Sequence, residues 1–279
     1  MSRSGRGLVA AGLLAPAALL FAILFVWPQL GLFAQSVTQP APFGLAAYER
    51  FLGDAYYLGV LGNSLALGGC VTVVTLLLGF PLALLLARME SRWAGLLLLL
   101  TTFPLWVSAV VRSFAWMVLF FRAGVASRLL QGTGLVASDY QLLGSFTGVV
   151  IALAQVLLPI MIVTLYAVIR GIDRDLEDAA MSLGAAPSVA MWLVTLRLAR
   201  GGVLAGSLLV FSLSVSAFAT PSLVGGARAH FMAVTIYEQT LELLDWPFAS
   251  AISAILLAIA LVVALSYGRL LGDNDGAAR

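Results

Sequence analysis

A short charged segment interrupts this apolar chain at residues 173–178, which read Asp-Arg-Asp-Leu-Glu-Asp. Five of these six residues are charged, although only 10% of the whole chain is. Charge of this density is too costly for hydrocarbon, so the segment is expected to lie outside a membrane. The chemistry that such residues offer is electrostatic contact with a partner, and acids at the start of a helix also stabilise its positive end.

The residues that follow predict two short helices joined by a sharp turn. Ala179 and Ala180 keep the first helix, over 173–183, slim, and Gly184 suits the turn after it. Pro187 then fits the first turn of a second helix. An acid-edged elbow of this shape would fit a groove on a cytoplasmic partner. An ordinary solvated loop is the alternative that spacing alone leaves open.

Composition places this elbow in an integral membrane protein. The chain has 279 residues, of which 62% are hydrophobic, against about 45–50% in soluble domains, and its mean hydropathy is +1.05. A spanning helix needs about 20 apolar residues. Apolar runs of that length, without the alternation of a barrel, predict an all-α bundle that forms a single domain, 1–279. The expected spans are residues 8–33, 61–87, 93–121, 145–169, 202–226 and 247–268.

Arginine sets the orientation, because basic residues are enriched in cytoplasmic loops. All 15 basic residues are Arg. With the N-terminus inside, ten of them lie in inner segments, four in outer segments and one, Arg112, within a span. This bias predicts that both termini and the loop 170–201 are cytoplasmic.

Missing residue types exclude several functions. Without any Lys, the chain has neither the Lys of a phosphate-binding P-loop nor a Schiff-base Lys. His230 is the only His and Cys70 the only Cys, which excludes a multi-His metal site and an internal disulfide. We therefore expect a non-catalytic subunit with no metal, cofactor or nucleic-acid partner of its own.

The elbow resembles a known motif. The run 178–180 (Asp-Ala-Ala), three residues, Gly184, nine residues and the run 194–196 (Val-Thr-Leu) resemble a loop of binding-protein-dependent ABC importer permeases. That loop reads Glu-Ala-Ala, three residues, Gly, nine residues and Ile-x-Leu-Pro. Asp178 replaces the usual Glu and keeps its charge, whereas Arg197 replaces the usual Pro. The residues to which the resemblance assigns contact with an ATPase are Glu177, Asp178, Ala179, Ala180 and Gly184.

Shorter strings narrow the resemblance to the spermidine/putrescine-type permeases, and to their first (B-type) subunit more than to their second (C-type) subunit. These strings are 63–65 (Asn-Ser-Leu), 103–107 (Phe-Pro-Leu-Trp-Val), 112–116 (Arg-Ser-Phe-Ala-Trp), 157–159 (Leu-Leu-Pro) and 245–248 (Asp-Trp-Pro-Phe).

The resemblance implies a type I ABC importer permease with six transmembrane helices and cytoplasmic coupling helices, in a bacterial inner membrane. It also implies a second permease subunit that completes a heterodimeric pore, two cytoplasmic ATPase subunits that bind ATP and Mg²⁺, and a periplasmic substrate-binding protein. The solute would be a polyamine or a similar small organic cation, moved from periplasm to cytoplasm. Alternative cargoes are an aminoalkyl-phosphonate, an opine-like amino acid, thiamine and ferric iron. An ion-coupled secondary transporter, the alternative from another class, would need acids within its spans, and the predicted spans have none.

Three hydroxyls and a proline suggest part of the solute pathway. Ser212, Ser216 and Thr220 recur every four residues, so they would share one helix face. Pro221 is expected to kink that helix. A hydroxyl-lined face that ends in a kink could serve as pore wall and gate. Hydrogen bonding between helices is the alternative role.

Arg112 is a second candidate, because a charge within a span is by default a functional hypothesis. It could bind an anion, which would argue against a polyamine. Alternatively it reaches the outer interface or pairs with an outer acid such as Asp139, and we favour this structural role.

The outer loops offer sites for a cation. Acids in these loops could attract a cationic solute. Tyr237 and Trp246, in an outer loop expected at 227–246, could add cation–π attraction for the same cation. Ordinary solvated loops are again the alternative. The acids are Asp139, Glu238, Glu242 and Asp245.

Glycine pairs at 144/148 and 202/206 are of the small-xxx-small type that lets helix backbones approach closely. Both pairs are therefore expected at helix–helix contacts.

Overall fold

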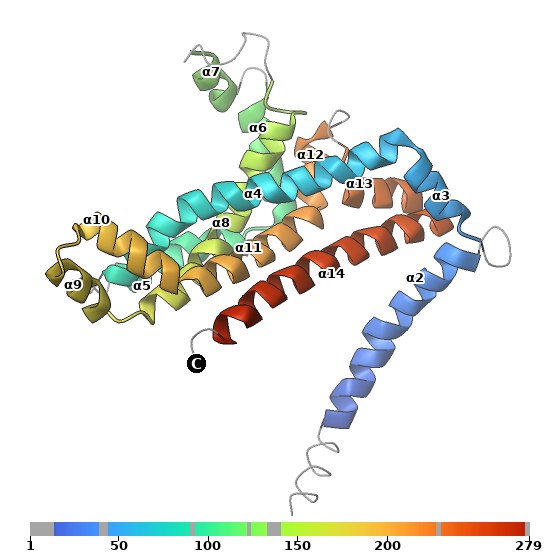
Figure 1. Ribbon diagram of the computed structural model, residues 1–279. Coiled ribbons are helices and arrows are strands. Elements are labelled where there is room, and N and C mark those ends of the chain that lie inside the picture. Colours follow the sequence, from blue (N-terminus) through green and yellow to red (C-terminus); the bar gives the residue numbers. More distant parts are fainter. Residues whose placement is uncertain are drawn as a thin grey trace, which may run out of the picture. The chain divides into compact units, whose positions relative to one another are not determined.

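The computed structural model describes residues 14–38, 44–89, 93–121, 124–132, 141–226 and 230–276. Throughout these ranges the regular structure is helical, without a strand, as Figure 1 shows. The predicted all-α membrane fold is confirmed. Five helices within these ranges are long and apolar enough to cross a membrane, namely Leu14–Thr38, Ala55–Arg88, Ala109–Arg128, Phe146–Arg170 and Trp246–Arg269.

The chain packs as two compact units. One comprises 1–58 and 235–258, and the other 59–234 and 259–279. Three helices contribute residues to both units, namely α4 (Ala55–Arg88), α13 (Met232–Tyr237) and α14 (Trp246–Gly276). The elements that belong to the first unit alone are η1 (Ala22–Val26), α2 (Trp27–Thr38), α3 (Ala46–Gly53) and η5 (Glu238–Glu242).

Aromatic packing organises the first unit. The Tyr48 hydroxyl lies 2.8 Å from Ser36 Oγ and joins α3 to α2. The rings of Phe51 and Phe248 both pack against Tyr57, with centroid distances of 5.8 and 4.9 Å. The start of α4 is therefore held beside α3 and the start of α14.

The segment 227–246 differs from the outer loop that the sequence predicted. Its described part is mostly helical, because α13 and then η5 run through Glu242. Phe231 and Met232 are buried at the start of α13. Burial of these apolar side chains favours a packed helix over a solvated loop.

The core of the second unit is built around α8 (Phe146–Arg170), in which Val149, Met161 and Ile169 have no exposed surface. The neighbouring α11 (Arg200–Val215) packs along α8. The predicted contact at glycines 202 and 206 is confirmed, because an added Cβ would lie 2.9 Å from the Val168 side chain and 2.8 Å from the Met161 sulfur, respectively.

The other glycine pair does not form a helix–helix contact, so that prediction was wrong. Gly144 precedes α8 in a turn, with a φ of 77°. Ser145 caps α8 by accepting a hydrogen bond from the amide of Gly148 at 3.0 Å. A Cβ at Gly148 would lie 2.1 Å from the carbonyl oxygen of Leu142. Gly148 therefore serves the tight entry into α8, while Gly144 lies in the turn before it and donates its amide to the carbonyl of Val224 at 2.9 Å.

Two of the expected spans are interrupted. The run 93–121 consists of α5 (Trp93–Thr102), the 3-10 turn η2 (Phe103–Trp106) and α6 (Ala109–Phe120), which α7 (Val125–Gly132) follows. Pro104 explains this break, because its nitrogen cannot donate a helical hydrogen bond. The run 202–226 consists of α11 and α12 (Ala219–Val224), which residues 216–218 separate.

Candidate functional site

The elbow predicted from the sequence is present in the second unit. It consists of α9 (Asp175–Ser182), a turn, α10 (Pro187–Ala190) and the π-helix η3 (Met191–Leu196). Asp175, Glu177 and Asp178 lie in the first turn of α9. Carboxylates in that position interact favourably with the positive end of the helix dipole. Local sequence therefore specifies where this helix starts.

Gly184 ends α9 in a left-handed conformation with a φ of 94°. The amide of Ala185 donates to the carbonyl of Ala180 at 3.1 Å, and that of Gly184 to Met181 at 2.9 Å. These two bonds form a Schellman motif, which satisfies carbonyls at a helix end. No atom lies within 4 Å of a Cβ added at Gly184. Backbone conformation, and not lack of space, therefore selects glycine, and the predicted turn is confirmed.

The first part of the motif, up to Gly184, is largely exposed. Asp178, Ala179 and Gly184 are exposed, whereas Ala180 is half-buried. Leu183 is 91% exposed, the highest value among the large apolar side chains described. The elbow thus exposes both an acid and a large apolar side chain, a mixed surface that a protein partner can bind.

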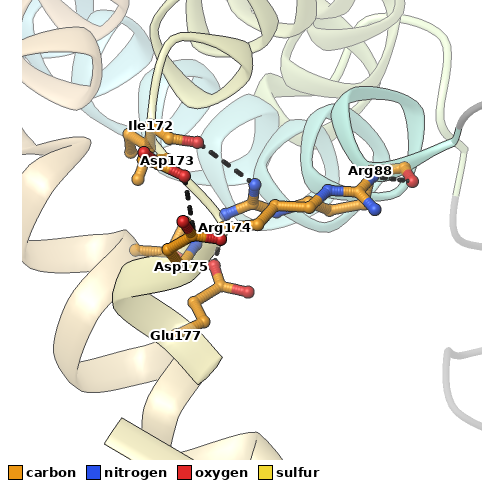
Figure 2. Close-up of polar contacts among 7 residues, drawn as sticks. Arg88, Ile172, Asp173, Arg174, Asp175 and Glu177 are labelled. Atoms are coloured by element: carbon orange, nitrogen blue, oxygen red, sulfur yellow. Dashed lines mark hydrogen bonds and ion pairs between the residues drawn. The ribbon is translucent and has the colours of Figure 1, made fainter. Parts of the chain in front are cut away.

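Glu177 has different surroundings from Asp178. Figure 2 shows its carboxylate directed toward the guanidinium of Arg88, at the C-terminal end of α4. Glu177 Oε1 accepts hydrogen bonds from Arg88 Nη2 and from Thr195 Oγ1 of η3. The side chains of Arg88 and Glu177 are only 19% and 20% exposed, and Thr195 is fully buried. Hydrogen bonds to charged groups contribute about 1.5–3 kcal/mol when solvent is largely excluded.

Further bonds fix the loop before α9 to the same helix end. Arg88 Nη1 donates to the carbonyl of Ile172 at 3.3 Å, and the Arg88 carbonyl accepts from Arg174 Nη2 (Figure 2). The amide of Asp175 donates to Asp173 Oδ1 at 3.1 Å. The start of α9 is thus tied to α4 through side chains and backbone together.

Sequence reasoning identified Glu177 but missed Arg88 and Thr195. From the sequence, Arg88 is recognisable only as a positive charge at the end of an apolar run, where it would stabilise the last carbonyls of a helix. Its acidic partner lies 89 residues away, and no local pattern connects the two. Thr195 falls inside the recognised motif but at a position that the motif does not specify.

Arg112 lies in α6 and reaches back across the break in its span. Its Nη1 donates to the carbonyl of Pro104 in η2, which also accepts the amide of Val107 at 3.3 Å. Asp139, the acid considered as a partner, lies outside the described residues. Arg112 therefore bridges α6 and η2, and a role in the solute pathway stays a prediction.

The three hydroxyls at 212, 216 and 220 do not share one helix face, so this prediction was wrong. Ser216 caps the end of α11 and donates through Oγ to the carbonyl of Ser212 at 2.8 Å. Thr220 belongs to α12, where its Oγ1 lies 3.2 Å from Ser113 Oγ of α6. The break between α11 and α12 interrupts the four-residue period on which the prediction depended.

Pro221 does not kink a helix either. It is the third residue of α12, where an amide hydrogen would have no acceptor within the helix. Proline at this position therefore costs α12 no backbone hydrogen bond. The break between α11 and α12 comes before it and ends at Phe218. The predicted discontinuity exists, but proline is not its direct cause.

Asp245, in the first unit, is already paired with a cation of the chain. Its Oδ2 accepts from Arg50 Nη1 at 2.8 Å. Its Oδ1 accepts from the amide of Phe248 at 3.2 Å and so caps the start of α14. The Arg50 guanidinium also lies 4.0 Å above the centre of the Phe248 ring. Asp245 thus has a structural partner in addition to its predicted place at the outer mouth.

Two of the other candidates near Asp245 are more accessible. Tyr237 and Trp246 are 41% and 48% exposed, and Glu238 is half-buried at the start of η5. Contact of these residues with a solute stays a prediction. Among the described residues, no group of three or more His, Cys, Asp or Glu side chains is placed to hold a metal ion.

Two residues of the string 63–65 make tertiary hydrogen bonds. Ser64 Oγ, near the beginning of α4, accepts the amide of Met232 at 2.8 Å. Asn63 Nδ2 donates to the carbonyl of His230 at 3.4 Å. These bonds fix the turn that leads into α13. A second polar contact missed by sequence reasoning joins Trp116 Nε1 to Gln155 Oε1 at 3.3 Å, between α6 and α8.

Comparison with known proteins gives a family for this arrangement. A family model described as "binding-protein-dependent transport system inner membrane component" matches residues 79–271. This range contains α9, the turn at Gly184 and η3, together with the C-terminal end of α4 that carries Arg88.

Several curated permeases are similar to the chain over most of its length. The spermidine/putrescine transport system permease protein PotB of Haemophilus influenzae is 32% identical over 223 residues, which cover 79% of this chain and 78% of the relative. PotB of Escherichia coli K12 is 31% identical over 227 residues, covering 81% and 82%. The molybdenum transport system permease protein ModB of Mycobacterium bovis is 34% identical over 200 residues, covering 71% and 73%.

A solved structure has a similar fold. It is a bacterial alginate ABC transporter in complex with alginate pentasaccharide-bound periplasmic protein. One of its chains matches with a TM-score of 0.79 at 17% identity, covering 95% of this chain and 94% of that chain. At this identity the likeness shows the fold alone.

Proposed function

The chain belongs to the family of binding-protein-dependent transport system inner membrane components, and we propose that it serves an ATP-driven importer of a polyamine or a similar small organic cation. Family membership makes it a multi-pass permease subunit of an ABC transporter. The energy source, the direction of transport and the solute are the parts that we propose.

The exposed edge of α9 is the observation that carries the proposal. A chain without Lys has no phosphate-binding P-loop, so a partner must hydrolyse ATP. Asp178, Ala179 and Leu183 form an accessible surface on an elbow whose shape Gly184 fixes. We place the ATPase subunits on this surface. A periplasmic binding protein and a second permease subunit complete the proposed assembly.

The cargo is proposed from the relatives named as spermidine/putrescine permeases. A molybdenum species is the second candidate, because a molybdenum permease is 34% identical over 200 residues.

Reconstitution tests the proposal. The chain is purified and placed in liposomes with the ATPase, second permease and binding protein that we expect the neighbouring reading frames to encode. We expect the ATPase to co-purify, and spermidine or putrescine to stimulate ATP hydrolysis and to be transported. Absence of a co-purifying ATPase would overturn the importer assignment. Stimulation by molybdate and not by polyamines would overturn the cargo alone.

Two substitutions test the proposed ATPase surface. Asp178→Arg reverses the exposed charge, and Gly184→Trp adds bulk where the chain itself leaves 4 Å of free space around a Cβ. Both variants should insert into the membrane and lose uptake. Glu49→Arg, which changes an exposed acid in the first turn of α3, is the matched control. Normal uptake by both test variants would remove the ATPase from α9.

A further inference from the structure

One carboxylate oxygen joins three elements of the second unit. Glu177 belongs to α9, while the two donors to its Oε1 come from the last residue of α4 and from η3. These elements are distant in sequence, since Arg88 and Thr195 lie 89 residues before and 18 residues after Glu177. The contact is not needed to form α9, whose dipole and Schellman turn are local.

The ion pair between Glu177 and Arg88 is shielded from solvent and held by further hydrogen bonds. The ion pair is four-fifths shielded from solvent on both sides. Arg88 is itself fixed at its side chain by the Ile172 carbonyl and at its backbone by Arg174. Shielded, charge-assisted hydrogen bonds of this kind hold their partners in one geometry. A displacement of α9 must therefore displace the end of α4 or break the ion pair.

The two neighbouring acids of α9 have different surroundings. Asp178 is exposed on the side proposed for the ATPase, whereas Glu177 is directed to Arg88 and Thr195. A force that a partner applies through the exposed edge of α9 reaches α4 through Glu177, one residue away.

We propose that Arg88, Glu177 and Thr195 form a latch that transmits the movement of α9 to α4 and η3 during transport. Glu177 is then a positioning residue that couples ATP hydrolysis to the movement of the membrane helices. The proposal rests on the proposed function, because it requires an ATPase docked on α9. It gives Glu177 an internal role in place of direct contact with the ATPase, and it adds Arg88 and Thr195 to the coupling machinery.

The ratio of solute transported to ATP hydrolysed tests the latch in the complete reconstituted complex. Glu177→Gln keeps the size of the side chain and removes its charge. We expect the ratio to fall about 2- to 30-fold, while the ATPase stays bound and ATP hydrolysis continues. A merely structural role would lower the yield of assembled complex and leave the ratio unchanged. An unchanged ratio overturns the latch.

Two further variants sharpen the experiment. The double variant Arg88→Gln with Glu177→Gln should be no worse than Arg88→Gln alone, because Arg88→Gln already removes the contact with Glu177 in addition to the bond to the Ile172 carbonyl. Additive losses would overturn the shared contact. Glu49→Gln, which removes a solvent-exposed charge from α3, is the matched control and should leave the ratio unchanged.

If Glu177→Gln does not assemble, Thr195→Val decides the question. It retains the ion pair and the side-chain shape but removes one donor to Oε1. We expect a smaller fall in the ratio, and an unchanged ratio overturns the latch. Failure of the unsubstituted complex to bind its ATPase overturns the proposed function itself. Normal transport with an insensitive Glu177 overturns the latch only.

Discussion

At the scale of single residues, Glu177 and Asp178 show how adjacent acids in one helix acquire different roles. Successive helical residues point about 100° apart, so when Glu177 is directed to Arg88, Asp178 is turned to solvent. The first carboxylate is neutralised within the chain, and the second lies where a partner can meet it. The two positions are therefore not interchangeable, although both carry acids.

Gly184→Ala should destabilise the C-terminal end of α9 by about 1–2 kcal/mol. The cost is conformational, because an L-residue rarely adopts a φ of 94° and no atom obstructs the added Cβ. Hydrogen exchange at the amides of Gly184 and Ala185, which donate the Schellman bonds, is the measurement. Gly184→Asn is the control and should be milder, since Asn tolerates left-handed conformations. Equal exchange in both variants would contradict this explanation.

Asp245→Ala should destabilise the protein more than Asp245→Asn. Both remove the exposed ion pair with Arg50, which is worth about 0–1 kcal/mol. Only the Ala variant also removes the cap on the Phe248 amide, at a cost of about 1 kcal/mol. The unfolding temperatures of the two purified variants in detergent show which variant is less stable. Equal losses would mean that the side chain does not act as a cap.

Residues whose role depends on local geometry were predictable, and those with distant partners were not. Gly184 could be assigned because helix, turn and second helix follow one another in sequence. The pairing of Arg88 with Glu177 could not be assigned, since it depends on how α4 and α9 pack. Asp245 could be placed near an aromatic cluster, but its pairing with Arg50 depends on a contact across 195 residues.

At the scale of elements, the two interrupted spans are linked to each other. The helices that follow the breaks, α6 and α12, pack together and are joined by Ser113 and Thr220. Irregular backbone at membrane depth is tolerated only where protein or water surrounds it. The residues 107–108 and 216–218 therefore cannot face lipid and must be covered by protein or line an aqueous path.

Gly202→Ala should destabilise the contact of α8 with α11 more than Gly206→Ala. Overpacking of a close contact costs about 1–3 kcal/mol. At Gly202 the new Cβ meets the β-branched Val168 at 2.9 Å, whereas at Gly206 it meets the flexible end of Met161 at 2.8 Å. Val has little rotamer freedom in a helix, while Met can move aside. Thermal unfolding of both variants decides, and an equal or reversed order would contradict the argument.

The sequence predicts the helices themselves better than their interruptions. Apolar length identifies the runs 93–121 and 202–226, but it gives no reason for a break within them. Pro104 was a usable signal for the first break. The second break falls at Ser216–Phe218, which contains no proline or glycine. Pro221 follows this break, and the sequence wrongly suggested that it causes a kink. Packing of α12 against α6, and not local propensity, fixes that break.

At the scale of the whole molecule, the number of membrane crossings determines where the ends lie. Five long apolar helices alone would leave the termini on opposite sides. The segment from α11 through α12 adds a sixth crossing if it passes the membrane as one interrupted span. The segment from α5 through η2 to α6 must likewise be counted as a single membrane crossing. The arginine bias agrees with this even number.

A C-terminal fusion to green fluorescent protein should therefore fluoresce in cells, because that protein matures in the cytoplasm and not after export through the general secretion route. A C-terminal alkaline phosphatase fusion, which requires the periplasm, should be inactive. A fusion truncated after Gln141, between the third and fourth expected spans, is the control and should show the opposite pair of activities. An active phosphatase at the full-length C-terminus would require a five- or seven-crossing topology.

The long helix α4 has a consequence for timing. Within the second unit it is hydrogen-bonded near one end to the turn before α13, through Ser64 and Met232, and at the other end to α9, through Arg88 and Glu177. From Ser64 to Arg88 the helix rises through 24 residue steps (88 minus 64), or about 36 Å. Pro81 removes one hydrogen bond from this stretch, but the helix continues through it, so a push on Arg88 along the axis would be carried to Ser64. The two ends of the second unit would then change state in phase rather than in succession.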